Sequence, residues 1–243
     1  MSSEVAEVSN DTVRKRETRP CAECFTDVEA DVIEFAGRRI EFTVVCDECE
    51  KRLLAEQDEK DNVERDSRLI KEFNDLCPPL YQDTDLTRIY SGFARAATHW
   101  PYGPKGVTLI GAAGEGKTRA AWMLLKRIHM TGKKVYGLTG TQLGKFAADQ
   151  WHSRSEEKRN AEEAIDRCRQ CSLLLIDDLG KQKFTERAEL ELYDILEYRT
   201  SHLRPTIVTA NSDGKELLNM LSEDRGEPIL RRIQEFSTTI KKK

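Results

Sequence analysis

One short stretch, Gly106–Thr118, constrains the fold of this 243-residue chain more than any other. Its sequence is GVTLIGAAGEGKT: a mainly apolar segment typical of a strand, then a loop of the pattern G-x-x-x-x-G-K-[ST], where x is any residue. Apolar side chains then recur at helical spacing as far as His129. A strand, a glycine-rich loop and a helix in this order predict a phosphate-binding loop (P-loop).

The residue types of this loop suit the binding of a nucleoside triphosphate. Glycines at positions 111, 114 and 116 allow backbone angles that other residues avoid, so that N–H groups turn inward around phosphate oxygens. Lys117 supplies a positive charge for the outer phosphates, and Thr118 a hydroxyl for Mg²⁺. The alternative is a glycine-rich turn without a ligand. The predicted phosphate cradle consists of Gly111, Ala112, Ala113, Gly114, Glu115, Gly116, Lys117 and Thr118.

A second motif disfavours that alternative. The segment Leu173–Gly180, LLLIDDLG, is a run of apolar residues followed by two aspartates, and such a run is typical of a strand buried on both faces of a parallel sheet. Its carboxyl end is where such sheets bind ligands. Asp177 is placed to hold Mg²⁺ through water, as a Walker-B aspartate does. On their own, Asp177 and Asp178 could equally end a strand or cap a helix; after a P-loop, we favour the magnesium site.

Strands and helices are expected to alternate from residue 106 onward. Amphipathic helices separate predicted strands at 107–110, 134–138, 173–176 and 205–211. This alternation predicts an α/β fold, a P-loop NTPase core whose largely parallel sheet is sandwiched by helices. One strand lies between the P-loop strand and the Walker-B strand in the sequence, and the strand at 205–211 ends in Asn211. These features favour the additional-strand class of P-loop ATPases.

Four of the seven cysteines form two C-x₂-C pairs, at Cys21, Cys24, Cys46 and Cys49. The pairs are separated by 21 residues, just outside the common spacing of about 15–20 in four-cysteine zinc sites. Strands are predicted at 31–35 and 39–45, and a helix at 47–57. Together these features resemble a treble-clef zinc finger, in which four thiolates close a structural Zn²⁺ site that docks a partner rather than performing chemistry. The alternative is four unliganded cysteines in a small core.

A third C-x₂-C pair, Cys168 and Cys171, is interpreted as structural. No second pair lies near it in the sequence, and Cys171 adjoins a predicted buried strand. A cysteine in such a place behaves as a small apolar residue.

Composition and charge indicate the broad class of protein and its possible partners. No stretch of about 18 apolar residues is present, and the N-terminus has no apolar signal region, so we expect a cytoplasmic protein that does not contact a membrane. The net charge of −4 provides no global attraction for nucleic acid, so any such contact must be local. The expected organisation is a disordered N-terminus (1–20), a zinc-binding domain (21–57), a helical linker (58–76) and an ATPase domain (77–243).

Residues 77–236 resemble the DnaC/IstB-type AAA+ ATPases, which load replicative helicases or assist transposases. The resemblance rests on a series of short blocks in order: CPPLY at 77–81, GAAGEGKT at 111–118, LLLIDDLG at 173–180, EYR at 197–199, RPT to TAN at 204–211 and GEPILRRI at 226–233. This order is more specific than any single block. The cysteine-rich segment lies outside it, as a separate specificity module.

The resemblance implies a set of catalytic residues. Asn211 matches the sensor that orients the attacking water, and Asp178 stands where many AAA+ proteins have a catalytic glutamate. Arg232 matches the arginine finger, which acts on the ATP of a neighbouring subunit, with Arg231 as the alternative. No lid domain is expected after these arginines. The implied catalytic set is Lys117, Asp177, Asp178, Asn211 and Arg232.

The resemblance also implies single-stranded DNA as a partner. The residues available for charge and base stacking are Lys145, Trp151, His152, Arg154, Lys158 and Arg159. A solvated helix interrupted by one aromatic residue is an equally good interpretation of this segment.

The function expected from the sequence is an ATP-dependent helicase loader, an ATPase with ATP, Mg²⁺ and Zn²⁺ as cofactors. Its N-terminal region would bind the replicative helicase, and its ATPase domain would bind single-stranded DNA and self-associate through the arginine finger. One alternative is an IstB-like transposase helper, which predicts a basic N-terminal region, whereas residues 21–66 are rich in acidic side chains. Another is a nucleotide-switched adaptor with negligible turnover.

Overall fold

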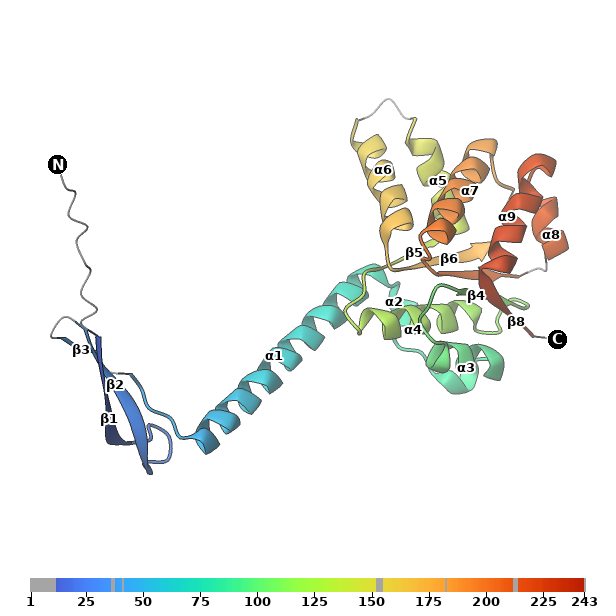
Figure 1. Ribbon diagram of the computed structural model, residues 1–243. Helices are drawn as coiled ribbons and strands as arrows, with labels where there is room; N and C mark the ends of the chain where they lie inside the picture. Colours follow the sequence, from blue (N-terminus) through green and yellow to red (C-terminus); the bar gives the residue numbers. More distant parts are fainter. Residues whose placement is uncertain are drawn as a thin grey trace, which may run out of the picture. The chain divides into compact units, whose positions relative to one another are not determined.

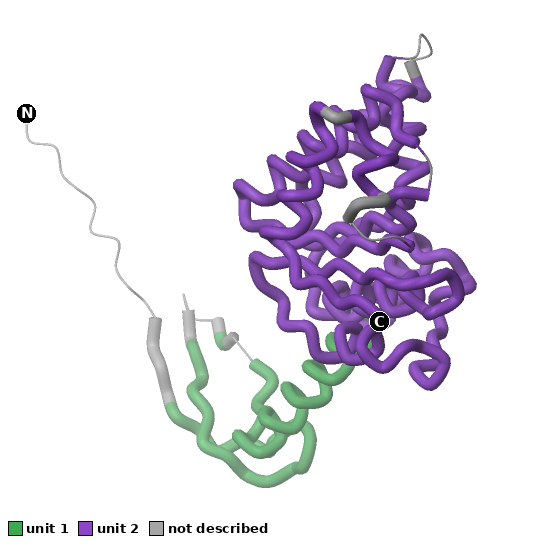
Figure 2. The backbone as a smooth tube through the Cα atoms, turned by 90° about the vertical axis from the view of Figure 1, so that its right-hand side faces the viewer, with its two compact units in different colours: residues 1–65 green, residues 66–243 purple. Residues whose placement is uncertain are grey.

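The chain divides into two compact units, the first ending at Arg65 and the second beginning at Asp66 (Figure 2). The computed structural model describes residues 12–35, 38–40, 42–151, 155–181, 183–211 and 214–242.

The first unit is built on a three-stranded antiparallel sheet of order β1-β2-β3. Its strands are β1 (Thr12–Pro20), β2 (Asp27–Phe35) and β3 (Arg38–Ile40). The disorder predicted for residues 1–20 is wrong for β1, which pairs along its whole length with β2. An ion pair at 3.6 Å between Arg16 Nε and Asp31 Oδ1 adds to this pairing, and one at 2.7 Å between Arg39 Nη2 of β3 and Glu17 Oε2 of β1 links the two outer strands. Residues 1–11 lie outside the described residues. The strand predicted at 39–45 corresponds to β3, which is shorter.

A single helix, α1 (Asp47–Leu76), joins the helix predicted at 47–57 to the helical linker predicted at 58–76. The charged middle of α1 contains no proline or glycine, and pairs four residues apart, such as Arg52 with Glu56 and Arg68 with Glu72, support a continuous helix. Phe73 is fully buried in the core of the second unit. The last turns of α1 therefore belong to the ATPase unit and not to a linker.

The second unit is a parallel five-stranded sheet with helices on both faces (Figure 1). The strand order is β5-β6-β7-β4-β8, with bounds β4 (Gly106–Ile110), β5 (Val135–Thr139), β6 (Leu173–Leu179), β7 (Thr206–Ala210) and β8 (Ser237–Lys241). The first four residues of β6 are almost completely buried, which explains their continuous apolar run. The predicted α/β sandwich is confirmed.

Two apolar cores flank the sheet. One packs the end of α1 with α3 (Ser91–His99) and α4 (Lys117–His129); the other packs α5 (Gly140–Asp149), α6 (Ser155–Gln170), α7 (Glu186–Ser201), α8 (Gly214–Asn219) and α9 (Glu223–Glu235). The helix predicted at 85–98 is instead a 3₁₀ turn, η1 (Leu86–Arg88), followed by α3, because Ile89 is extended and Tyr90, the N-cap of α3, is not helical. A one-turn helix, α2 (Pro79–Gln82), begins at the second of the two prolines that follow α1.

The strand order places the functional motifs at one edge of the sheet. Strand β7 lies between the P-loop strand β4 and the Walker-B strand β6, as the additional-strand class requires. All five strands are parallel, so Gly111, Asp177 and Asn211 are all at the carboxyl edge.

Candidate functional site

The P-loop has the backbone geometry of a phosphate cradle. Gly114 and Gly116 have φ angles of 84° and 85°, in the left-handed region that glycine adopts at little cost. Gly116 is the N-cap of α4, and it provides no side chain to pair with the first N–H groups of the helix. Those N–H groups and the positive end of the helix dipole are therefore directed at the loop, where a triphosphate would bind.

Lys117 is held inside this loop. Its side chain is 5% exposed, and Nζ donates to the carbonyl oxygens of Gly111 and Ala112, both at 2.8 Å. Burial lowers the pKa of Lys117, and the nearby carboxylates of Asp178, Glu115 and Asp177 oppose that shift. An incoming triphosphate can replace the two carbonyls as a stronger partner for this ammonium group.

Asp177 is the buried acid of the site. Its Oδ1 accepts hydrogen bonds from Thr118 Oγ1 at 3.0 Å and from Thr209 Oγ1 at 2.6 Å. Burial raises the pKa of Asp177, although these two hydrogen bonds act in the opposite direction. The hydroxyl of Thr118 and the carboxylate of Asp177 are thus brought together as predicted, and their oxygens are the type of ligand that Mg²⁺ prefers.

Asp178 lies at an irregularity of β6. Its φ angle is +55°, and the pairing of β6 with β7 shifts register between Ile176 and Leu179. Its backbone N–H donates to Thr209 Oγ1 at 2.9 Å, and its carboxylate lies 3.4 Å from Lys181 Nζ. The irregularity gives the two consecutive acids different surroundings, one buried on the sheet and one half-exposed beside a lysine.

Thr209 is a site residue that sequence reasoning missed. It is fully buried in β7, and its hydroxyl joins Asp177 to the backbone of Asp178. The sequence did contain a signal for this residue, namely a threonine two residues before Asn211. When β7 neighbours β6, a hydroxyl at that position lies beside the Walker-B acids. Asn211 itself is exposed directly after β7 and adjoins the P-loop, since Gly111 N donates to Ala210 O at 3.3 Å.

Tyr81 of α2 is a second residue that the site analysis missed. Burial raises the pKa of Tyr81, and the charges of Asp177 and Asp178 raise it further, so its ring lies within their field. The guanidinium carbon of Arg119 lies 5.8 Å from the centre of that ring, and Nη1 of Arg119 donates to Leu80 O at 3.0 Å. The CPPLY block thus contributes a tyrosine near the acids and binds Arg119 of α4.

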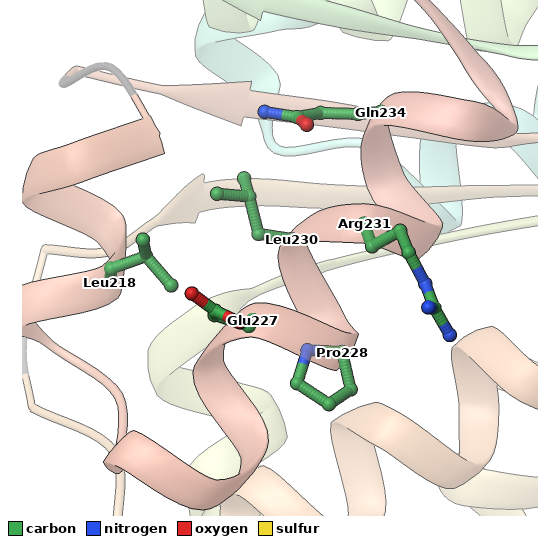
Figure 3. Close-up of a pocket in the computed structure, with 6 residues that line it drawn as sticks. All are labelled: Leu218, Glu227, Pro228, Leu230, Arg231 and Gln234. Carbon is green, nitrogen blue, oxygen red and sulfur yellow. The ribbon is translucent and has the colours of Figure 1, made fainter.

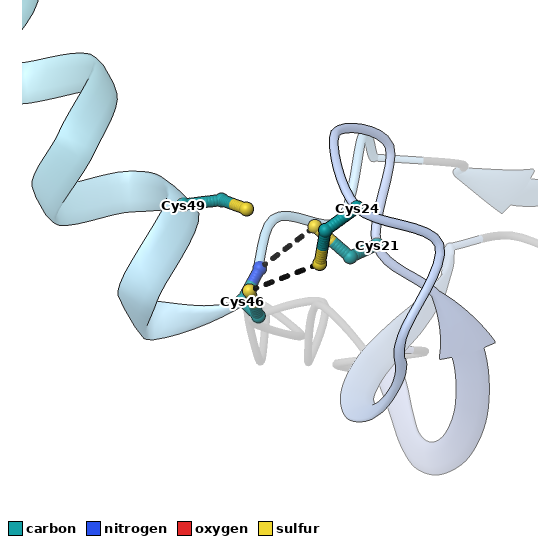
Figure 4. A group of neighbouring side chains, drawn as sticks. All are labelled: Cys21, Cys24, Cys46 and Cys49. Carbon is teal, nitrogen blue, oxygen red and sulfur yellow. Dashed lines mark hydrogen bonds between the residues drawn. The ribbon is translucent and has the colours of Figure 1, made fainter.

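The four predicted zinc ligands lie together in the first unit (Figure 4). Their sulfur atoms are all within 4.8 Å of one another, and a tetrahedral Zn²⁺ with Zn–S bonds of about 2.3 Å requires separations of about 3.8 Å. The backbone N–H of Cys46 donates to Cys21 Sγ at 3.3 Å, and such bonds lower the pKa of Cys21 to about 6, whereas burial raises that of Cys49 to about 12. The cysteine set fits a closed structural Zn²⁺ site.

The third cysteine pair has the structural role predicted for it. Cys168 and Cys171 are buried, and burial raises the pKa of both thiols. The fully buried Arg199 donates to the carbonyl oxygens of Cys168 at 2.7 Å and Cys171 at 3.0 Å. These bonds join the end of α6 to α7.

The two candidate finger arginines have different surroundings on α9. Arg232 pairs with the carboxylate of Glu197 on α7, and its side chain is 16% exposed. Arg231 is exposed and lines a pocket of about 330 Å³ beside Glu227 and Leu230 (Figure 3).

The predicted DNA-contact residues are only partly described. His152 and Arg154 lie outside the described residues, whereas Lys145, Lys158 and Arg159 are exposed. Trp151 is 74% exposed, and the guanidinium carbon of Arg187, which the sequence analysis did not select, lies 5.4 Å from the centre of a ring of Trp151.

The sequence matches the family model described as IstB-like ATP binding protein over residues 94–240, more than half of the chain. The chain belongs to this IstB-like family. Membership confirms the resemblance drawn from the sequence blocks and establishes a nucleotide-binding P-loop protein. No curated protein matches the sequence.

Solved structures agree with the IstB-like fold. The structure of DnaI is similar with a TM-score of 0.57 at 20% identity, over 68% of this chain and 94% of that one. A putative primosome component from Streptococcus pyogenes serotype M3 has a TM-score of 0.51 at 21% identity, over 69% of this chain and 90% of that one. AMPPCP-bound DnaA from Aquifex aeolicus has a TM-score of 0.52 at 15% identity, over 68% of this chain and 50% of that one.

These identities establish the fold and not the activity. The IstB-like chain spans half of that DnaA chain and 43% of a DNA replication initiation factor that it also matches. None of the helices in the described residues combines the length and apolar character that crossing a bilayer requires.

Proposed function

We propose that this protein is an ATP-dependent helicase loader in DNA replication, which hydrolyses ATP in the second unit and binds the replicative helicase through its N-terminal region. The observation that carries the ATPase part is the network of Thr118, Asp177 and Thr209 beside the buried Lys117. A docking role for the first unit is supported by its cysteine set, because a closed four-thiolate Zn²⁺ site leaves no open position for catalysis.

Each residue of the second unit has a role in the proposed hydrolysis. Thr118, and Asp177 through water, would hold Mg²⁺, which neutralises phosphate charge when bound. Lys117 would exchange its two loop carbonyls for phosphate oxygens. Asp178 would accept the proton of the attacking water that Asn211 orients. Because Asp178 is shorter than glutamate and is paired with Lys181, we expect hydrolysis to be slow until a partner changes these surroundings.

Self-association and DNA binding complete the proposal. Arg232 would act on the ATP of a neighbouring copy, which makes turnover depend on assembly. Exposed Trp151, with Arg187 beside it, would stack on bases of single-stranded DNA, and Lys145 would add charge near the backbone.

Two other functions have specific support. A transposase helper of the IstB type is favoured by the family match, but the acidic character of residues 21–66 disfavours a first unit that binds duplex DNA. A nucleotide-switched adaptor with negligible turnover is favoured by the pairing of Asp178 with Lys181.

The discriminating experiment is a pull-down of the replicative helicase of the source cell or phage, run with ATP, with ADP and with Lys117→Ala. Lys105→Ala, which replaces an exposed lysine before β4, is the matched control. ATP-sensitive capture that requires the four cysteines supports the loader. Assembly on duplex DNA without helicase capture would instead identify a transposase helper, and capture without turnover would identify the adaptor.

A further inference from the structure

Arg232, the proposed finger, is bound within its own chain. Its guanidinium group pairs with the carboxylate of Glu197 through Nε and Nη2. Nη2 also lies 3.4 Å from the hydroxyl of Tyr193, and the guanidinium carbon lies 5.4 Å from the centre of the tyrosine ring. Tyr193 and Glu197 are four residues apart on α7, so they lie on the same face and hold Arg232 of α9 together.

The neighbouring Arg231 provides an internal comparison. Both arginines are on α9, yet Arg231 is exposed and lines the pocket of Figure 3, whereas Arg232 is 16% exposed. The helix therefore places one arginine in solvent and keeps the other against α7. A finger that acts on another subunit must reach outward, so Arg232 has to leave Glu197 before it can act.

We propose that Glu197 is a positioning residue that holds Arg232 in the isolated chain. On assembly it releases Arg232, which then binds the triphosphate of a neighbouring copy. This inference rests on the trans role of Arg232 in the proposed function. Nε and Nη2 of Arg232 both contact Oε2 of Glu197, and the oxygens of a terminal phosphate accept from the same donors, so the carboxylate and the phosphate compete for them. The pair keeps the finger in place before assembly and raises the protein concentration that assembly requires.

The test is the dependence of the ATPase rate on protein concentration. Glu197→Gln keeps the shape of the side chain but removes its charge, so the concentration at half-maximal rate should fall roughly threefold to fivefold, because a partly exposed pair contributes modestly. Tyr193→Phe removes only the hydroxyl contact and should shift the same concentration less. Glu191→Gln is the matched control, since Glu191 is also on α7 but pairs with Arg169.

A mixing experiment separates this inference from the function on which it rests. Arg232→Ala and Lys117→Ala proteins are each expected to be inactive, and a mixture should regain activity because one supplies the finger and the other the ATP site. If the mixture regains activity but Glu197→Gln leaves the protein concentration at half-maximal rate unchanged, the positioning role of Glu197 is overturned and the trans role of Arg232 stands. Complementation by Arg231→Ala instead of Arg232→Ala, or by neither, would overturn both the inference and the trans role of Arg232.

Discussion

The hydroxyl of Thr209 donates to Asp177 Oδ1 at 2.6 Å and accepts the backbone N–H of Asp178 at 2.9 Å. One buried threonine therefore fixes both acids of the Walker-B motif from the neighbouring strand. It orients the carboxylate that faces Thr118, and it satisfies a backbone group at the irregularity of β6.

Replacing Thr209 with valine should loosen this arrangement while conserving side-chain volume. The buried N–H of Asp178 loses its acceptor, so the free energy of unfolding should fall by about 1–3 kcal/mol in denaturant titrations. Asp177 also loses a hydrogen bond to its charged form, which raises its pKa further and increases the Mg²⁺ concentration needed for half-maximal ATP hydrolysis. Thr239→Val, an exposed change on β8, is the control. An unchanged Mg²⁺ requirement would show that Thr209 does not orient Asp177.

The fold and the core of the site follow from the sequence because they depend on local patterns. The apolar run of β6 and the glycines of the P-loop specify a buried strand and a phosphate cradle without any knowledge of the rest of the chain. The positions of Thr209 and Tyr81 depend on strand order and on the packing of α2 against α4, which no local pattern specifies. The charged middle of α1 was expected to be a helical linker, and it is helical; what local patterns did not specify is that one helix continues from Asp47 to Leu76, with ion pairs four residues apart along it.

Glu115 of the P-loop forms an ion pair with Lys242, which directly follows β8. Glu115 Oε1 lies 3.0 Å from Lys242 Nζ, while Oε2 is buried and has no hydrogen-bond partner among the described residues. A side chain at Gly111 would meet that oxygen at 2.2 Å, and the backbone N–H of Lys242 donates to Ile110 O at 3.1 Å. An ion pair and a backbone hydrogen bond thus connect the residue after β8 to the P-loop and its strand.

A double-mutant cycle measures the coupling free energy between Glu115 and Lys242. Lys242→Ala leaves the Glu115 carboxylate without its cation, so ATP affinity should fall, whereas Glu115→Gln removes a negative charge near Lys117 and should raise it. The double variant should recover most of the affinity lost in Lys242→Ala, with a coupling free energy of about 1 kcal/mol. Binding of a fluorescent ATP analogue is the measurement, and Lys105→Ala is the control. Additive effects would mean that the two residues act independently.

The four-cysteine site should hold one Zn²⁺, and its removal should unfold the first unit selectively. Metal release measured with a colorimetric chelator should accompany protease sensitivity before residue 65, while the second unit keeps its ATP affinity. Binding displaces protons from thiols, notably Cys49 with a pKa of about 12, so retention should weaken as the pH falls. Cys46→Ser should lose the metal, and Cys77→Ala, a change in the core of the second unit, should keep it. Full zinc retention in Cys46→Ser would contradict the assigned ligand set.

Trp151 should contribute base stacking to the binding of single-stranded DNA. Its ring is exposed and lies beside Arg187, so Trp151→Ala removes a stacking surface without opening a core, and thermal stability should change little. Loss of one stacked base weakens binding by about 1–3 kcal/mol, a decrease that fluorescence anisotropy with a labelled oligonucleotide can measure. Arg187→Ala should also reduce the salt dependence of binding, because one cation near the phosphates is lost. Phe42→Ala, an exposed aromatic change in the first unit, is the control. Equal affinities for Trp151→Ala and the unmodified protein would place the DNA surface elsewhere on the second unit.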